Sequence, residues 1–223
     1  MPAKERSPRI TVLAGANGAG KSSLLGALLR ERKQDYYNPD EETRRILAGN
    51  PQLTEEQANS LAWQKGREGL ERAIAERRSY ALETTLAGRT IPALLRDAAA
   101  AGLELFVWYV GLDTPEHHIA RVRARVTRGG HSIPEETIRD RYVRSRENLI
   151  ELIPVLSALR LFDNSFEADP FEGEHPAPKL LLEFESRRVV RPDHETLVTR
   201  TPAWARSIVA TALQVALTSD DRG

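Results

Sequence analysis

A run of small residues with a single lysine follows the first apolar segment of the chain, residues 10–14. Gly15, Gly20, Lys21 and Ser22 have the spacing G-x-x-x-x-G-K-[ST]. Glycines let the backbone approach phosphate oxygens, and successive N–H groups of such a loop form a cradle for anions. The lysine then reaches the β- and γ-phosphates, and the hydroxyl binds Mg²⁺. The alternative is a glycine-rich turn that binds nothing, but the order of apolar strand, loop and helix favours a nucleotide-binding P-loop.

We therefore predict ATP and Mg²⁺ as the cofactors, with Lys21 as a catalytic residue and Ser22 as the metal ligand. The residues predicted to contact ATP are Gly15, Ala16, Asn17, Gly18, Ala19, Gly20, Lys21, Ser22 and Ser23. A carboxylate partner for the metal is not evident, because Asp113 follows the apolar run 103–111 but stands beside Thr114, a natural helix cap. Small-molecule kinases can hold Mg²⁺ with the P-loop hydroxyl and water. The lack of a clear carboxylate therefore favours a small-molecule kinase over a motor ATPase.

Asp40 is the second candidate for chemistry. It follows the helix expected over residues 22–33 by one short strand and a turn. At the carboxyl end of that strand, a carboxylate would face the phosphates across the crevice. It could accept the proton of an acceptor hydroxyl and direct its oxygen at the γ-phosphate. Asp40 could equally cap the helix expected over residues 41–48, and the residues alone leave both roles open.

A third group of polar side chains stands at the end of the strand expected over residues 79–85. Glu83, Thr84 and Thr85, with Arg89 shortly after them, offer carboxylate, hydroxyl and guanidinium groups. Such groups suit hydrogen bonding to a polyhydroxylated or phosphorylated acceptor. The alternative is an ordinary strand end, with threonine present for its β-propensity.

Arginines are dense between residues 121 and 146. Arg121, Arg125 and Arg128 are spaced four and then three apart, so they share one face of a helix, and a Gly-Gly-His sequence ending at His131 follows. This pattern is typical of a mobile lid, in which Arg125 and Arg128 would meet the charge on the transferred phosphoryl group. A solvated helix face and a nucleic-acid patch are the alternatives; the near absence of aromatic residues weighs against the latter. No role follows for the adjacent His117 and His118.

Strand and helix patterns alternate along the chain and must position these groups. The expected strands are residues 10–14, 35–40, 79–85, 103–111 and 159–162. The expected helices are residues 22–33, 41–48, 54–78, 91–101, 114–128, 132–158 and 203–217, with capping boxes at Thr54 and Ser132 and a hairpin at 179–191. This alternation predicts an α/β, P-loop NTPase-like fold: a mostly parallel sheet with helices on both faces and an Arg-rich helical lid.

The predicted core spans residues 1–166 and contains the lid at about 114–158. Residues 167–223 add an acidic exposed loop, the hairpin and a helix packed on the same domain. The 223 residues include 32 basic and 32 acidic side chains and no cysteine. Nucleic acid is therefore an unlikely partner on charge grounds. Without an apolar span, a secretory signal or cysteine, we expect a cytoplasmic protein with no membrane association. We also expect a monomer.

The assembled motifs resemble the zeta-toxin family of P-loop kinases, and in particular the branch of zeta-toxin-like predicted ATPases with a Gly-Gly-His lid. The resemblance covers roughly residues 10–165 and rests on GANGAGKSS, Asn38-Pro39-Asp40, Glu83–Leu86, the segment 121–134 and Asp163-Asn164-Ser165. It implies ATP-dependent phosphorylation of the 3′-hydroxyl of UDP-N-acetylglucosamine, and kinship with toxins implies an antitoxin protein as a partner.

By this resemblance Asp40 is the catalytic base, Glu83 and Thr85 hold the sugar nucleotide, and Arg125 is the first lid arginine. The chain departs from the family where Arg89 replaces an earlier arginine and where His131 aligns with the second lid arginine, whose charge Arg128 would supply. The residues predicted to bind the acceptor are Asp40, Glu83, Thr84, Thr85, Arg89 and His131. The alternatives are a kinase for a nucleoside, dinucleotide or nucleic-acid 5′-hydroxyl, and a non-catalytic ATP-binding switch.

Overall fold

The computed structural model describes residues 7–22, 36–166 and 177–220. Within them, six strands form one mixed sheet in the order β2-β1-β3-β4-β5-β6. Strands β2, β1, β3 and β4 run parallel, and β5 and β6 are antiparallel additions at one edge. The strands are β1 (Arg9–Ala14), β2 (Tyr80–Thr84), β3 (Glu104–Gly111), β4 (Ala158–Asp163), β5 (Lys179–Glu185) and β6 (Arg188–Arg191). The predicted fold class is confirmed, and the hairpin forms as predicted.

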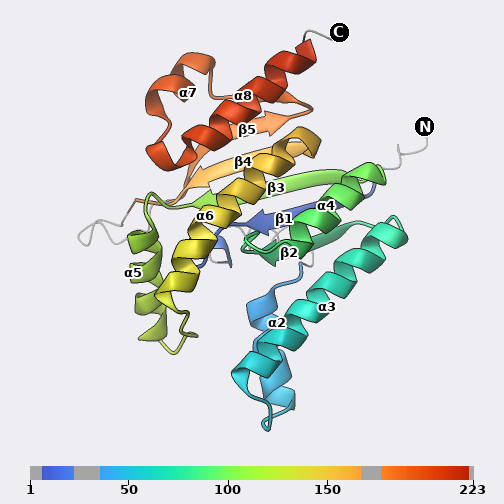
Figure 1. Ribbon diagram of the computed structural model, residues 1–223, viewed down its shortest axis with the longest axis vertical. Coiled ribbons are helices and arrows are strands. Elements are labelled where there is room, and N and C mark those ends of the chain that lie inside the picture. The colour runs from blue at the N-terminus through green and yellow to red at the C-terminus, as the bar shows by residue number, and fades with distance from the viewer. Residues whose placement is uncertain (1–6, 23–35, 167–176, 221–223) are drawn as a thin grey trace.

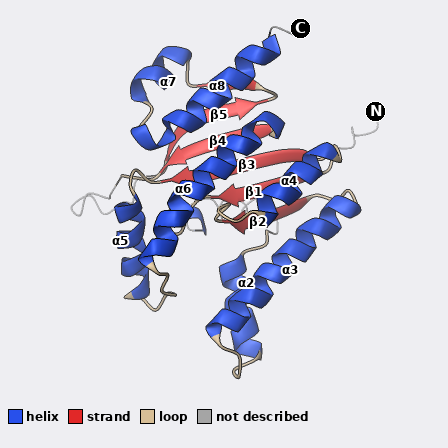
Figure 2. Ribbon diagram, in the orientation of Figure 1, coloured by secondary structure: helices blue, strands red, loops and turns tan. Residues whose placement is uncertain are grey.

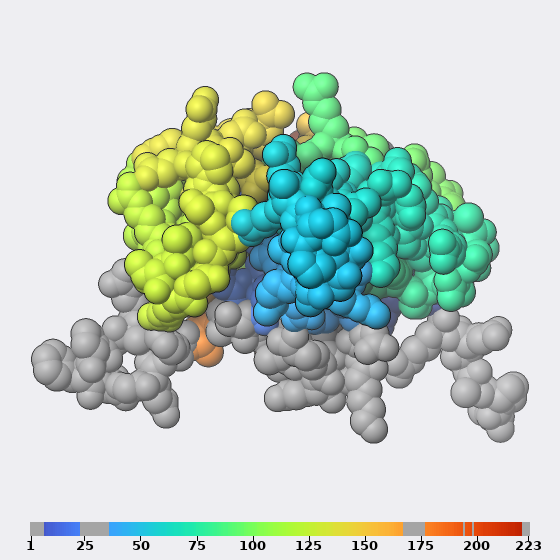
Figure 3. Space-filling view, turned by 90° about the horizontal axis from the view of Figure 1, so that it is seen from below, coloured from blue at the N-terminus to red at the C-terminus, as the bar shows by residue number. Residues whose placement is uncertain are grey.

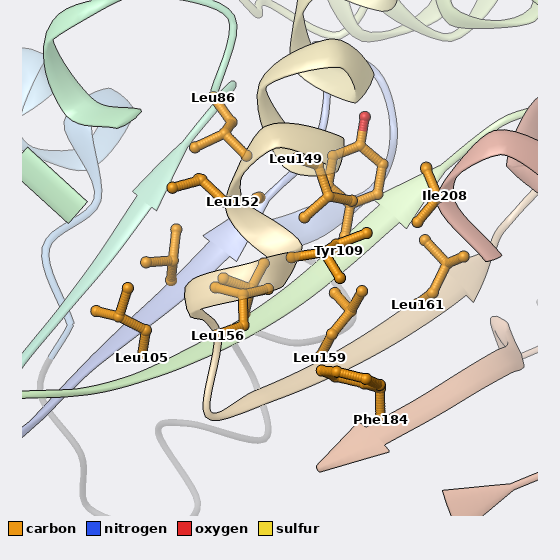
Figure 4. Close-up of a cluster of buried hydrophobic side chains, with 14 of the residues drawn as sticks. Leu86, Leu105, Tyr109, Leu149, Leu152, Leu156, Leu159, Leu161, Phe184 and Ile208 are labelled. Carbon is orange, nitrogen blue, oxygen red and sulfur yellow. The ribbon is translucent and has the colours of Figure 1, made fainter. Parts of the chain in front are cut away.

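The main core lies on one face of the sheet. Helices α4 (Thr90–Ala100), α6 (Glu135–Leu152) and α8 (Arg206–Asp220) lie across that face (Figures 1 and 2). Leu149 and Leu152 of α6 pack against Tyr109 and Leu159 of the central strands, and all four side chains are buried (Figure 4). The Tyr109 hydroxyl is satisfied inside this core by a 2.9 Å hydrogen bond with Ser145. Of the helix expected over residues 22–33, Ser22 is described and is helical, and the rest lies outside the described residues.

Two helices, α2 (Pro39–Gly49) and α3 (Glu55–Ala75), form an antiparallel pair that projects beyond the sheet (Figure 1). The capping box predicted at Thr54 is present, with Gln57 as its partner. The short strand expected before α2 is reduced to one parallel bridge between Tyr37 and Leu82. That bridge still ties the start of α2 to the edge of the sheet, because Tyr37 exchanges two 2.8 Å backbone hydrogen bonds with β2.

The lid region consists of α5 (Pro115–Val126), a loop and α6. Thr114 caps α5 as predicted. The capping box predicted at Ser132 is wrong, because Pro134 is the N-cap of α6 and its ring fixes the backbone without a side-chain hydrogen bond. The predicted extension of α6 to residue 158 is also wrong: the helix ends at Leu152, and Ala158 pairs with β3 instead.

The C-terminal part holds a helix that the sequence did not predict, α7 (His194–Arg200), whose first turn Asp193 caps through the Thr196 N–H. The terminal helix α8 is present and begins after a 3₁₀ turn at Ala203–Ala205. Most of the loop expected over residues 167–178 lies outside the described residues. No helix in the described part of the chain combines the length and the apolar character needed to cross a membrane.

Candidate active site

The P-loop follows β1 and passes closely between two other elements. Gly15 has φ +140°, and a Cβ there would stand 2.2 Å from the carbonyl oxygen of Val110 in β3. Gly18 has φ +82°, and its Cβ would stand 2.7 Å from the carbonyl oxygen of His118 in α5. Both positions therefore require glycine for conformation and for space. The loop is held between the central strand and the first lid helix.

Lys21 lies buried at the base of this loop. Its ammonium donates hydrogen bonds to the carbonyl oxygens of Gly15 (2.7 Å) and Ala16 (3.2 Å). Burial lowers the pKa of Lys21, and the nearby carboxylate of Glu83, 3.9 Å away, opposes that shift. A desolvated ammonium group that is held by two carbonyl oxygens and has one more N–H to donate is well suited to pair with a phosphate oxygen.

Glu83, at the end of β2, is the carboxylate nearest to the candidate metal ligand. The Ser22 hydroxyl donates to it, with Oγ 2.9 Å from each carboxylate oxygen, and the Asn38 amide donates at 3.2 Å. Burial raises the pKa of Glu83, while Lys21 and the Ser22 hydrogen bond oppose the rise. A hydroxyl and a carboxylate side by side are hard oxygen donors that fit Mg²⁺, which takes one or two carboxylates together with substrate phosphates.

Asp113, the carboxylate that the sequence left without a clear role at the metal, is bound by another side chain. Its side chain is about half exposed and accepts a 2.9 Å hydrogen bond from His117. Glu83 is the carboxylate that contacts the Ser22 hydroxyl, although its sequence context predicted acceptor binding. Ser23, also predicted to contact ATP, lies outside the described residues.

Asp40 does not cap its helix. The Asn38 side chain is the N-cap of α2 and accepts from the N–H groups of Asp40 (2.9 Å) and Glu41 (3.2 Å). The carboxylate of Asp40 therefore remains outside the capping interaction and lines the cleft above the P-loop. One of its oxygens lies 3.7 Å from a guanidinium nitrogen of Arg125, which belongs to the opposite wall. The structure thus removes the capping alternative that the sequence left open.

The lid arginines differ in their surroundings. Arg125 donates to the carbonyl oxygen of His131 at 3.0 Å, which folds the lid loop back against α5. Arg121 donates to the carbonyl oxygen of Asn164 at 2.7 Å, beyond the end of β4. Arg128 is exposed and lines the cleft. His131 Nδ1 lies 2.5 Å from a carboxylate oxygen of Glu55, the first residue of α3. The lid tip therefore contacts the wall that carries Asp40.

These elements enclose one cleft of about 1800 Å³. Helices α2 and α3 form one wall, α5 and α6 form the other, and blue residues of the N-terminal segment are visible at its floor (Figure 3). Arg89 does not line the cleft but is exposed at the N-cap of α4. The predicted site residues that line it are Asn17, Gly18, Gly20, Lys21, Ser22, Asp40, Glu83, Thr84, Thr85, Arg125, Arg128 and His131. Most groups that the sequence predicted to act together are therefore brought together.

Residues 1–168 match the family model described as Zeta toxin. The chain belongs to the Zeta toxin family. It is 32% identical over 129 residues to an uncharacterized protein of Haemophilus influenzae, a match that covers 57% of this chain and 88% of the relative. The resemblance predicted from the motifs is thus confirmed at the level of the family.

Solved structures of low sequence identity share the fold of this zeta-toxin-family chain. A chain of the AvrRxo1-ORF1:-ORF2 complex has a TM-score of 0.62 at 15% identity, covering 94% of this chain and 71% of that one. The same complex with ATP also gives 0.62, at 17% identity and 89% and 65% coverage. A chain of the PezAT toxin–antitoxin system of Streptococcus pneumoniae gives 0.56 at 12% identity, covering 96% and 88%. At these identities the likeness shows a P-loop kinase-like fold.

Arg141 and His118, to which the sequence assigned no role in the site, both hold Asn17 of the P-loop. Arg141 of α6 donates to the Asn17 side-chain oxygen at 2.8 Å, and burial lowers its pKa while Asp40 opposes the shift. His118 of α5 hydrogen-bonds the Asn17 carbonyl oxygen through Nδ1 at 2.7 Å, and burial lowers its pKa to about 4. The arginine run was visible in the sequence, but which arginine meets the P-loop depends on how α6 packs.

Proposed function

We propose that this protein is an ATP-dependent kinase that phosphorylates a hydroxyl of a small nucleotide-like acceptor, with UDP-N-acetylglucosamine as the expected acceptor. The observation that carries the proposal is the position of Asp40 and Arg125, 3.7 Å apart in the cleft whose floor holds Lys21. A carboxylate and a guanidinium group facing each other near a phosphate cradle can serve proton removal and charge stabilisation together. Membership in the Zeta toxin family supports the proposal.

The size and charge of the cleft support a reaction between two substrates. Its volume of about 1800 Å³ exceeds the roughly 300–1,000 Å³ of a site for one small ligand. Basic side chains outnumber acidic ones along its lining, although the chain as a whole has no net charge. The P-loop N–H groups and Lys21 would hold the triphosphate, and an ATP-bound neighbour of similar fold supports ATP as the donor. We also propose cytoplasmic localisation.

We propose that Ser22 and Glu83 hold Mg²⁺, which, when bound, neutralises charge on the phosphates. Asp40 accepts the proton of the acceptor hydroxyl as that oxygen bonds to the γ-phosphorus. The bond from the γ-phosphorus to the bridging oxygen breaks, and ADP leaves with that oxygen. Arg125, Arg128 and Arg141 stabilise the charge on the transferred group, since guanidinium groups suit phosphoryl oxygens.

Acceptor binding is proposed for the groups beyond the phosphate cradle. Thr84 and Thr85 line the cleft at the end of β2, and His131 lines it from the lid. Their hydroxyl and imidazole groups can hydrogen-bond sugar hydroxyls. Glu83 would lie between the ATP site and the acceptor site. It contacts Ser22 of the P-loop, and it stands beside Thr84 at the end of β2. Arg89 is left out of this group, because it is exposed at the N-cap of α4 and does not line the cleft.

The test is to incubate the full chain with Mg²⁺-ATP and a panel of nucleotide sugars and to detect a product heavier by one phosphate by mass spectrometry. Asp40→Asn should lower the transfer rate about 10²- to 10⁴-fold while ATP still binds. The matched control is Glu42→Gln, which changes a carboxylate in the same helical turn that does not line the cleft. Normal transfer by Asp40→Asn would falsify the assignment of the base.

An antitoxin partner is proposed on kinship alone, since a structural neighbour comes from a toxin–antitoxin system. Expression of the intact chain in a growth assay, beside Asp40→Asn, tests whether the activity harms the cell. Growth arrest by the first and not by the second would support a need for such a partner. Equal growth of both, with kinase activity shown in extracts, would contradict it.

A further inference from the structure

Asn17 of the P-loop contacts both lid helices through two different polar atoms. Its backbone carbonyl oxygen accepts a 2.7 Å hydrogen bond from Nδ1 of His118 in α5. Its side-chain oxygen accepts a 2.8 Å hydrogen bond from Nη1 of Arg141 in α6. The amide atom that faces the guanidinium must be the oxygen, because an arginine side chain can only donate. One residue therefore joins the phosphate cradle to both helices of the lid.

The sequence of α6 places Arg141 on the inward face of that helix. Ile138 stands three residues before it and Ser145 four residues after it, and both of these side chains are buried. Residues at such spacings share one side of a helix. The same stripe continues through Leu149 and Leu152, which pack on the sheet (Figure 4). Arg141 therefore points inward at the level where α6 passes the P-loop.

The guanidinium of Arg141 lies among the charged groups of the phosphate site. Arg141, Lys21 and Asp40 all line the cleft. Burial lowers the pKa of Lys21, and the positive charge of Arg141 adds to that shift. Burial also lowers the pKa of Arg141, and the carboxylate of Asp40 opposes that shift. Because charge interactions weaken with distance, these mutual effects place Arg141 near both the phosphate-binding lysine and the proposed base.

The partner of Arg141 differs from the partners of its neighbours in the lid. Three neighbouring arginines donate to carboxylates: Arg123 to Glu135, Arg139 to Glu116 and Arg144 to Asp140. Arg141 donates to the neutral amide of Asn17. An amide oxygen fixes the direction of a guanidinium without neutralising its charge, whereas a carboxylate would form an ion pair. The charge of Arg141 therefore stays available for an anionic ligand.

We propose that Asn17 is a positioning residue, whose side-chain amide holds the Arg141 guanidinium toward the γ-phosphate of ATP. The inference rests on the proposed function, which places the triphosphate on the P-loop. Because ADP lacks the γ-phosphate, this contact distinguishes ATP from ADP. A donor that is fixed before the ligand arrives needs no reorganisation on binding. Loss of the Asn17 amide should therefore weaken the contact although Arg141 itself is still present.

The first experiment measures binding to the full chain by calorimetry with Mg²⁺, using ADP and the non-hydrolysable ATP analogue adenylyl imidodiphosphate as probes. Asn17→Ala removes the amide but keeps the backbone carbonyl oxygen that binds His118, so the loop stays tied to α5. It should lower the affinity for the ATP analogue about tenfold, as for the loss of a hydrogen bond to a charged group, and leave the affinity for ADP unchanged. Arg139→Ala is the matched control, because Arg139 lies on the same helix, pairs with Glu116 and does not line the cleft.

A double-mutant cycle tests whether Asn17 acts through Arg141. Arg141→Ala should lower the preference for the ATP analogue over ADP at least as much as Asn17→Ala does. The double variant should lower it no further than Arg141→Ala alone, because an anchor has no effect once its guanidinium is gone. Additive losses would overturn the proposal, since Asn17 would then act on the nucleotide independently. Equal affinity of Asn17→Ala and the intact chain for the ATP analogue would also overturn it, as would an equal loss of affinity for both probes.

The positioning role and the kinase fail separately. A preference for the ATP analogue that depends on Asn17 through Arg141, without any phosphorylated product, would support the positioning role and contradict the kinase. A phosphorylated product formed by Asn17→Ala with the same kcat/KM for ATP as the intact chain would support the kinase and overturn the positioning role. Where both proposals hold, Asn17→Ala lowers the kcat/KM for ATP about tenfold and leaves the KM for the acceptor unchanged.

Discussion

Protonation of His118 should destabilise the folded protein in weakly acidic solution. His118 is buried on α5, and its Nδ1–H donates to the carbonyl oxygen of Asn17, because a carbonyl can only accept. Burial lowers its pKa from 6.5 to about 4; the hydrogen bond to Asn17 opposes this shift, and the positive charges of Lys21 and Arg121 add to it. The His118 imidazole therefore binds a proton below about pH 6.5 in the unfolded chain but only below about pH 4 in the folded chain.

The magnitude follows from the size of this pKa difference. Stability from His118 is complete above pH 6.5 and is lost as the pH falls toward 4. The whole difference corresponds to about 3 kcal/mol, and about 2.5 kcal/mol of it is lost by pH 4.5. Carboxylates titrate over the same range, so the wild-type protein alone does not isolate the histidine.

The assay is urea unfolding at pH 7.5 and pH 4.5 for the wild type and for His118→Asn. Asparagine keeps a donor near the position of Nδ1 but does not titrate. Its free energy of unfolding should fall between the two pH values by about 2.5 kcal/mol less than that of the wild type. An equal fall in both proteins would refute the reasoning, as would an NMR titration that places the His118 pKa near its ordinary value.

Three further substitutions test the geometry of the site. Gly15→Ala should lower the melting temperature by roughly 5–10 °C, because the new Cβ would stand 2.2 Å from a β3 carbonyl oxygen. Gly49→Ala is the control: its Cβ would meet open space, so the melting temperature should not fall. Glu83→Gln should raise the Mg²⁺ concentration needed for tight ATP binding about tenfold or more in calorimetry; an unchanged requirement with a raised acceptor KM would instead assign Glu83 to the acceptor. Arg141→Ala should lower kcat about a hundredfold in the kinase assay, while Arg139→Ala, whose partner is Glu116, should leave it unchanged.

Elements that depend only on neighbouring residues could be predicted from the sequence. The capping box at Thr54 and the cap at Thr114 are local hydrogen-bond patterns, and both form. The apolar run of β3 predicted a central strand, because a strand buried on both faces has no polar alternation. The capping box predicted at Ser132 does not form, because α6 begins after Pro134, two residues later. The predicted end of α6 at residue 158 is wrong, because the pairing of β4 with β3 overrides the local helix propensity.

The site was predictable to the extent that the topology fixes it. Strand ends of a parallel sheet meet at one edge, so the P-loop and Glu83 had to lie close together. Asp40 was ambiguous until Asn38 proved to be the cap. The faces of long helices were not predictable, since the packing of α5 and α6 decides that His118 and Arg141 contact the P-loop. The division of the chain at residue 166 and the catalytic roles stay predictions.

The contacts of Arg141 and Arg125 indicate different roles for these two lid arginines. Arg141 is partly buried and bound to the P-loop side chain of Asn17 at 2.8 Å, so its guanidinium is positioned before a substrate arrives. Arg125 instead pairs loosely with Asp40, at 3.7 Å and with 39% of its side chain exposed, and such a pair contributes little stability. Because the hydrogen bond to the carbonyl oxygen of His131 is made by the other terminal nitrogen, Nη2, the Nη1 group can exchange the carboxylate for a phosphoryl oxygen without breaking that bond. That movement would release Asp40 to accept a proton at the moment when charge develops on the phosphate.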